Sequence, residues 1–324
     1  MIKKDFIYRF LTYLIMISAI LLPWFADAKY NQDLLVMVVY LKTVFEQTNF
    51  IQSFNDNITL LYVIRKCLPL LSPYTLVFIL HNIAVVLLTF TLKKYLRPIY
   101  VCAIMLFSFF TIFCNQFRLA YALVLGLNGF MVYFHNKKKG VFLIILSLFF
   151  HVFVAFFILS IFLIDVYNRG KRWMKNLILF MMLLAIGGLY LFVTNNSRFA
   201  LYLTSDESSY VSTTFILVIF AVLLLWKSID KGKKIFVVFT LFLVIVSAPL
   251  SNISSRLGEL LFLLMPFISR DAVNFRWSYL WDSKKLLPLA RFLYFLIGVS
   301  FFVYRFYNWV VMGKVIRPDI LDLL

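Results

Sequence analysis

The sequence predicts an all-α, polytopic integral membrane bundle with about ten hydrophobic segments. Hydrophobic residues make up 63% of the chain and charged residues only 14%. Apolar windows of roughly 20 residues recur along it, and each is long enough to cross about 30 Å of hydrocarbon as a helix. Barrel strands would instead alternate polar and apolar side chains. We therefore expect a single transmembrane domain over residues 1–324.

The expected spans follow the hydropathy pattern in chain order: Phe6–Ala26, Leu68–Leu92, Ile99–Cys114, Phe117–Phe134, Val141–Ile164, Leu177–Thr194, Val211–Trp226, Ile235–Leu250, Leu257–Ser269 and Leu286–Tyr304. The first span begins like a secretory signal, but its apolar stretch is longer than a signal core, so we predict a retained helix. Gly126, Gly187 and Gly188 are small enough to allow close helix contact. Between the first two spans, residues 27–67 are expected to form an extracytoplasmic loop with an amphipathic helix near 34–45.

A net charge of +18 is compatible with a nucleic-acid partner, but the distribution of the charge favours membrane topology. Basic residues gather in short loops between apolar spans, for example at Lys93 and Lys94, at Lys137–Lys139 and at Lys233 and Lys234. Cytoplasmic loops carry such an excess under the positive-inside rule. The sequence therefore predicts a cytoplasmic N-terminus and no nucleic-acid partner.

The segment Val141–Ile164 is expected to be broken or re-entrant. If it crossed fully, the basic loop from Arg169 to Lys175 and every later loop would change sides, which the charge bias disfavours. We predict a break near Phe150–His151, with both half-helices returning to the cytoplasmic side. Irregular backbone at membrane depth is tolerated where it lines a cavity walled by protein or filled with water.

A few ionisable residues interrupt the apolar segments, and these are the candidate functional residues. Arg118 lies between two apolar runs, and His151 lies within another. Charged groups at membrane depth cost a few kcal/mol or more, and they commonly line substrate paths. Arg256 and Glu259 occupy a later segment, one helical turn apart. We expect these residues to meet in one outward-facing cavity, where arginine forks suit a diphosphate.

The polar pattern around the first arginine resembles a known family. Asn115-Gln116-Phe117-Arg118, the basic turn Asn136–Lys139, and Phe150-His151 are similar to the Asn-x-x-Arg…Phe-His core of EpsG-like, Wzy-type polysaccharide polymerases. The stretch Asn252 to Leu257 is similar to their later arginine motif. This chain has Leu119 and Val154 where the family usually has Gln and Ser, and its early outer loop matches only faintly.

The resemblance implies a glycosyltransferase of the bacterial cytoplasmic (inner) membrane, with its active site facing the periplasm or cell exterior. It would join oligosaccharide repeat units of O-antigen, capsule or exopolysaccharide carried on undecaprenyl diphosphate. We assign diphosphate binding to Arg118, Arg256 and Asn115, and general-base or hydroxyl-orienting chemistry to His151 or Glu259. No cofactor or metal is expected. A chain-length regulator and a flippase are the implied protein partners.

Other interpretations remain open at this point. His151 could be a packing residue, Arg118 could extend to lipid headgroups, and Arg256 with Glu259 could be a structural ion pair. A lipid-glycan flippase or other transporter would favour two related halves, which the sequence does not display. A membrane O-acyltransferase would favour a histidine with an arginine near the first helix. An O-antigen ligase would use the same diphosphate chemistry and is the closest alternative.

Overall fold

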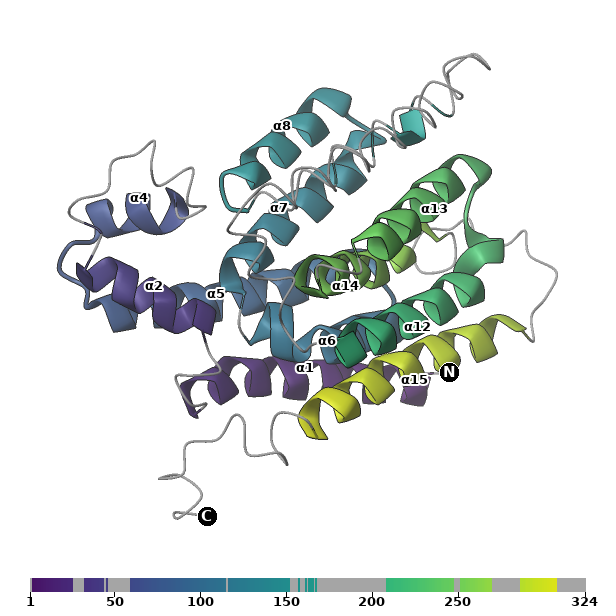
Figure 1. Ribbon diagram of the computed structural model, residues 1–324, viewed down its shortest axis with the longest axis horizontal. Helices are drawn as coiled ribbons and strands as arrows, with labels where there is room; N and C mark the ends of the chain where they lie inside the picture. The colour runs from purple at the N-terminus through teal and green to yellow at the C-terminus, as the bar shows by residue number, and fades with distance from the viewer. Residues whose placement is uncertain are drawn as a thin grey trace. The chain divides into compact units, whose positions relative to one another are not determined.

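The computed structural model describes residues 2–25, 32–43, 45, 59–114, 116–151, 157, 161, 163–165, 167, 208–247, 251–269 and 286–307, which Figure 1 draws as solid ribbon. The described residues are mostly helical and contain no strand. The chain divides into two units: residues 1–94, 105–158 and 302–324 form unit 1, and residues 95–104 and 159–301 form unit 2.

The helices of the first half of the chain, most of which belong to unit 1, are α1 (Ile2–Phe25), α2 (Gln32–Thr43), α4 (Thr59–Cys67), α5 (Pro73–Tyr95), α6 (Pro98–Phe107), the π-helical turn η2 (Phe109–Phe113), α7 (Phe117–Tyr133) and α8 (Lys137–Leu148). In the second half they are α12 (Ser208–Leu225), the 3₁₀ turn η4 (Trp226–Ser228), α13 (Lys231–Val246), α14 (Ser251–Ile268) and α15 (Leu286–Phe306). Both α6 and α15 contribute residues to each unit.

Three of these helices are long and apolar enough to cross a membrane, over Asp5–Pro23, Pro73–Tyr95 and Pro288–Phe306. Shorter apolar helices cover Pro98–Phe107, Phe117–Tyr133 and Thr214–Ser228. The described residues therefore fit a helical membrane protein. The predicted span Leu177–Thr194, together with Gly187 and Gly188, lies outside the described residues.

Helix α5 begins five residues later than its hydropathy indicates, because a local cap fixes its start. Pro73 occupies the first helical position, where its missing N–H has no consequence, and it disfavours a helical conformation at Ser72. The Ser72 hydroxyl then accepts a hydrogen bond from the Thr75 amide at 3.1 Å. An apolar stretch that includes Leu68 and Leu70 is therefore left in a corner before the helix.

Helices α7 and α8 form the closest helical pair in unit 1 and lie side by side in Figure 1. The side chain of Asn136 caps α8 by accepting from the Lys139 amide at 3.1 Å. Two glycines permit the contact: a Cβ on Gly140 would lie 2.5 Å from Tyr133 Cα, and one on Gly129 would lie 2.9 Å from the Gly140 carbonyl oxygen. Gly126 is also buried, but Gly129 and Gly140 are the positions that set this distance.

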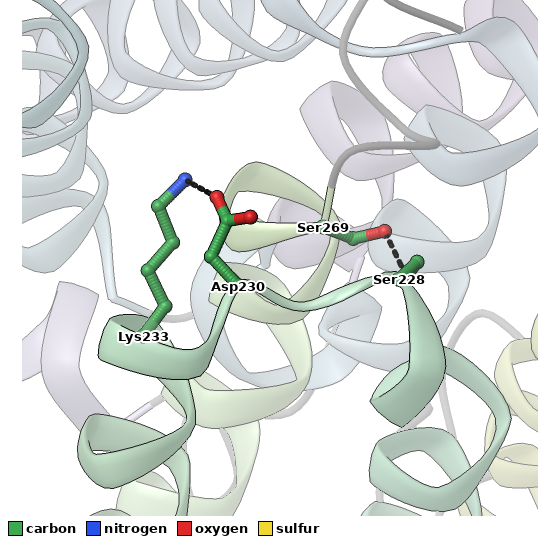
Figure 2. A network of polar contacts seen from close by, with 4 residues as sticks. All are labelled: Ser228, Asp230, Lys233 and Ser269. Atoms are coloured by element: carbon green, nitrogen blue, oxygen red, sulfur yellow. Dashed lines mark hydrogen bonds and ion pairs between the residues drawn. The ribbon is translucent and has the colours of Figure 1, made fainter. Parts of the chain in front are cut away.

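In unit 2, α12 and α14 run in the same direction, with α13 between them along the chain. Gly258, near the start of α14, lies against Thr214 near the start of α12. At the other end, the Ser228 and Ser269 hydroxyls are 2.5 Å apart (Figure 2). Ile229 forms an isolated antiparallel bridge with Ser269. This contact joins the α12–α13 connection to the end of α14.

Tyr294 of α15 is a central packing residue of unit 2. Its buried ring stacks on Phe262 of α14 at a centroid distance of 4.4 Å and meets the edge of Tyr100 of α6 at 5.3 Å. Its hydroxyl donates to the Phe262 carbonyl, so the one polar atom of the side chain is satisfied. One turn further along, Gly298 allows α15 to approach the backbone of Ala103.

Candidate functional site

Hydrogen bonds between α5 and α7 establish the direction of these helices in unit 1. The Tyr121 hydroxyl, near the start of α7, donates to the Leu80 carbonyl near the start of α5 at 2.9 Å. Farther along, Lys94 Nζ at the end of α5 donates to the Asn128 side chain of α7 at 3.3 Å. The two helices therefore run in the same direction. Arg118, in the first turn of α7, lies at the end of unit 1 where α5 begins.

Unit 1 thus has two chemically different ends. The lysine end holds Lys93 and Lys94, which close α5, and Lys137–Lys139, which open α8 beside the end of α7. The arginine end holds the first turns of α5 and α7, with Arg118. The His81 ring nitrogen Nε2 lies 3.1 Å from the Ala19 carbonyl of α1, and Lys93 contacts Tyr13. Helix α1 is therefore antiparallel to α5, and it ends at the arginine end.

The chain after α8 turns back along α7. Helix α8 begins at the lysine end and ends at Leu148, two residues before the position where the break is expected. The Phe150 ring then meets Tyr121 at a centroid distance of 6.0 Å, whereas Phe157 meets Phe130 at 6.1 Å. Tyr121 and Phe130 are nine residues apart on α7, or about 14 Å. The chain therefore reverses between Phe150 and Phe157; residues 152–156 lie outside the described residues.

This reversal places His151 at the arginine end of unit 1. His151 directly follows Phe150, whose ring contacts Tyr121, and it is half-buried. Arg118 is also half-buried and lies three residues before Tyr121, hence on a neighbouring position of the same helical face. Two of the predicted site residues are therefore brought to one end of one unit. Asn115 lies outside the described residues.

The backbone before Arg118 contains a π-helical turn that hydropathy did not predict. The amides of Cys114 and Gln116 donate to the carbonyls of Phe109 and Thr111, five residues earlier, at 2.9 and 3.0 Å. Such turns are uncommon and often occur at functional sites. The rings of Phe109 and Phe110 pack against Phe302 of α15 at centroid distances of 5.3 and 5.4 Å. The expected span Ile99–Cys114 is therefore two helical pieces.

Buried polar atoms flank this turn. The Ser108 hydroxyl is fully buried, and it and Gln116 Oε1 have no hydrogen-bond partner among the described residues. Leaving such an atom without a partner costs about 1–3 kcal/mol, so it is uncommon in folded proteins. A ligand with hydroxyl groups suits this surrounding. Sequence reasoning missed both residues, although Gln116 lies inside the quoted motif.

Arg256 and Glu259 belong to unit 2, where α14 carries both. Arg256 is half-buried, and Glu259 is buried with 3% of its surface exposed. Their spacing puts them on one face of α14, near its start. The Ser254 hydroxyl donates to the Val244 carbonyl at 2.8 Å and fixes this end of the helix against α13. The expectation that Arg118 and Arg256 share a cavity stays a prediction.

Unit 2 also has a lysine-rich end, opposite Arg256. Lys227 precedes the Ser228–Ser269 contact, and Lys233 follows it, with Nζ 3.6 Å from an Asp230 carboxylate oxygen (Figure 2). Lys234 lies 4.8 Å from the centroid of the Trp226 ring. In unit 2 these lysines lie at the opposite end of the helices from Arg256, as Lys93, Lys94 and Lys137–Lys139 do from Arg118 in unit 1.

Within the described ranges, no group of three or more His, Cys, Asp or Glu side chains could hold a metal ion. The expectation of a metal-independent reaction stays a prediction. Chemically, the arginine end of unit 1 supplies a guanidinium and an imidazole, and the π-turn that precedes α7 adds buried hydroxyl and amide groups. Groups of these kinds can bind an anion and orient or deprotonate a hydroxyl.

The fold and the polar end define a helical membrane protein with ionisable residues in its apolar segments. Comparison with protein-family models, with curated proteins and with solved structures finds no match.

Proposed function

We propose that this protein polymerises lipid-linked oligosaccharide repeat units at the outer face of a bacterial cytoplasmic membrane. The observation that supports it best is the placement of Arg118 and His151 at one end of unit 1, away from the lysine end. The Asn-x-x-Arg…Phe-His pattern that resembles the Wzy-type polymerases contains both residues. The proposed substrate is an oligosaccharide on undecaprenyl diphosphate.

Charge distribution supports an outward-facing site. Under the positive-inside rule, Lys93, Lys94 and Lys137–Lys139 face the cytoplasm, which leaves the arginine end of unit 1 facing outward. In unit 2 the same rule puts Lys227 and Lys233 inside and Arg256 outside. The proposal retains ten membrane segments and a re-entrant 141–164. The reversal between Phe150 and Phe157 supports the re-entrant part.

The proposed reaction transfers the growing glycan between two lipid-linked molecules. A hydroxyl oxygen of the incoming unit attacks the anomeric carbon of the growing chain, and the bond from that carbon to the diphosphate oxygen breaks. The leaving diphosphate keeps the electron pair of this bond. His151, or Glu259 as the alternative base, takes the proton of the attacking hydroxyl. Atoms and charge balance without a further reactant.

Negative charge increases on the diphosphate as this bond breaks, and Arg118 is suited to stabilise it. A guanidinium binds phosphate oxygens bidentately and stays charged at any physiological pH. The start of α7 adds the positive end of a helix dipole beside the same side chain. A fixed cation that meets developing charge lowers the barrier, typically by about 3 kcal/mol for one strong donor. Arg256 is the second proposed phosphate ligand.

The test uses a strain deleted for this gene and complemented with variants. We expect Arg118→Ala and His151→Ala to leave surface glycan at one repeat unit, with normal amounts of protein in the membrane. Purified protein in liposomes that contain the lipid-linked unit should form long glycan, and Arg118→Ala should not. Lys138→Ala is the matched control, because it removes an exposed cation from the lysine end.

The accumulated product separates the competing functions. Loss of a flippase leaves lipid-linked units inside the cell, and loss of a ligase leaves long glycan that is not attached to its acceptor. Loss of an O-acyltransferase leaves glycan of normal length without its acyl groups. Any of these outcomes in the deletion strain would refute the polymerase proposal. Normal chain length in His151→Ala would exclude only the role of His151.

A further inference from the structure

We propose that the corner between α4 and α5 is a docking surface for the membrane leaflet, which it engages by binding the anionic headgroups of phospholipids. We define the α4–α5 corner as residues 61–72. The corner contains none of the proposed catalytic residues. It combines exposed apolar side chains, positive charge and a position at the start of a helix that is long and apolar enough to span a membrane.

Apolar side chains at this corner face outward. Leu70 is fully exposed, and Leu68 and Val63 are 47% and 43% exposed. Leu61, on the other side of α4, is buried, so this helix has one buried and one exposed apolar side. Exposure of a whole leucine at a turn is unfavourable in water. Inserting Leu70 among acyl chains would recover the transfer free energy of that side chain.

Two cations accompany these leucines. Arg65 donates from Nη1 to the Leu71 carbonyl, which uses one of its five N–H groups and fixes the corner. Lys66 is exposed, and its Nζ lies 5.2 Å from the centroid of the Phe45 ring and 5.8 Å from that of Tyr62. These contacts hold Arg65 against Leu71, the residue after Leu70, and hold Lys66 against the aromatic rings. The charge of the corner is therefore complementary to lipid phosphate.

The position of the corner matches the membrane surface. Leu70 lies three residues before Pro73, the first residue of the membrane-spanning candidate α5. Tyr74, in the first turn of that helix, is half exposed, as tyrosines at membrane interfaces commonly are. Apolar side chains, cations and aromatic rings at one end of a span form the pattern of an interfacial anchor. Phospholipid is the occupant that all three features fit.

Cys67 gives a native probe of this surface. It is exposed within the corner, whereas Cys102 and Cys114 are buried. The full-length protein would be labelled at Cys67 with an environment-sensitive fluorophore and reconstituted in phosphatidylcholine vesicles with increasing phosphatidylglycerol. Quenching by spin-labelled lipid and by aqueous iodide would be measured. We expect lipid quenching to rise and iodide quenching to fall as phosphatidylglycerol increases.

Variants separate the apolar and the ionic contributions. Leu70→Asp should reduce lipid quenching at every lipid composition, and because Leu70 is fully exposed, the change removes no packing from the fold. Replacing Arg65 and Lys66 with Gln should raise the phosphatidylglycerol concentration at which the change in quenching is half complete. We expect an increase on the order of fivefold for each cation removed. Lys138→Gln, at the lysine end, is the matched charge control and should leave the titration unchanged.

Several outcomes would overturn the proposal. Iodide quenching that is equally strong with and without phosphatidylglycerol would mean that the corner stays in water. A response to added undecaprenyl diphosphate but not to phosphatidylglycerol would make the corner a carrier-lipid site instead. The Cys67→Ser protein tests whether the label reports this position, since it should take up no fluorophore. Wild-type quenching decides the question even if Leu70→Asp fails to fold.

Discussion

Substituting Gly140 with Ala tests whether the close α7–α8 contact holds the candidate site together. A Cβ at this position would lie 2.5 Å from Tyr133 Cα and 2.6 Å from its amide nitrogen, where ordinary contacts are 3.4–4 Å. Backbone atoms cannot rotate away, so α8 must move by roughly 1 Å. Overpacking of this kind costs about 1–3 kcal/mol, and the higher helix propensity of alanine returns at most about 1 kcal/mol. We therefore expect the free energy of unfolding to fall by about 1 kcal/mol.

The consequence should extend to function, because α8 leads directly to Phe150 and His151. Thermal unfolding of the purified protein should occur at a lower temperature, and surface glycan should become shorter. Gly258→Ala is the control, since among the described residues its Cβ would meet the Thr214 and Val218 methyl groups, at 3.2 and 3.6 Å, and no backbone atom. That variant should be at least as stable as the wild type, because alanine has the higher helix propensity, and its surface glycan should have normal length. A Gly140→Ala protein as stable as Gly258→Ala would refute the argument.

Three further predictions concern single side chains. Arg118→Lys keeps the charge and loses the planar fork, so glycan chains should shorten nearly as much as in an alanine variant, measured by gel electrophoresis; full length would contradict bidentate phosphate binding. Tyr121→Phe removes the donor to the Leu80 carbonyl and should lower the free energy of unfolding by about 1 kcal/mol, measured in denaturant. Ser228→Ala should lower it by a similar amount, because it leaves Ser269 without this partner; an unchanged value would show that the contact is not stabilising.

Hydropathy predicted the helices well where apolar length and local caps agree. Helix α7 was expected at Phe117–Phe134 and is found at Phe117–Tyr133. The first span was expected at Phe6–Ala26, and helix α1 ends at Phe25 but begins four residues earlier, at Ile2. The later start of α5 could have been predicted, because Ser72 before Pro73 is a capping sequence. The break expected near His151 rests on the sidedness of basic loops rather than on any local signal, and it stays a prediction.

The sequence could not predict features that depend on which faces meet. Gly126, Gly129 and Gly140 are equally small, and only the packing of α8 on α7 determines that the last two limit the contact. The π-turn before Arg118 leaves no mark in hydropathy, because one additional residue per turn changes hydrogen bonding and not composition. The burial of the Ser108 hydroxyl could not be predicted either, since burial depends on tertiary packing.

The geometry around Arg118 bears on the alternative that it only extends to lipid headgroups. A snorkelling arginine needs an apolar stem and a path to the interface, and any long cation serves the purpose. Here the arginine follows a π-turn that packs on Phe302 and that is flanked along the chain by the buried Ser108 and Gln116 polar atoms. His151 lies at the same end of the unit. Contact between Arg118 and lipid headgroups explains neither the buried Ser108 hydroxyl nor the reversal of the chain after α8. A polar ligand that enters the arginine end gives a reason for both.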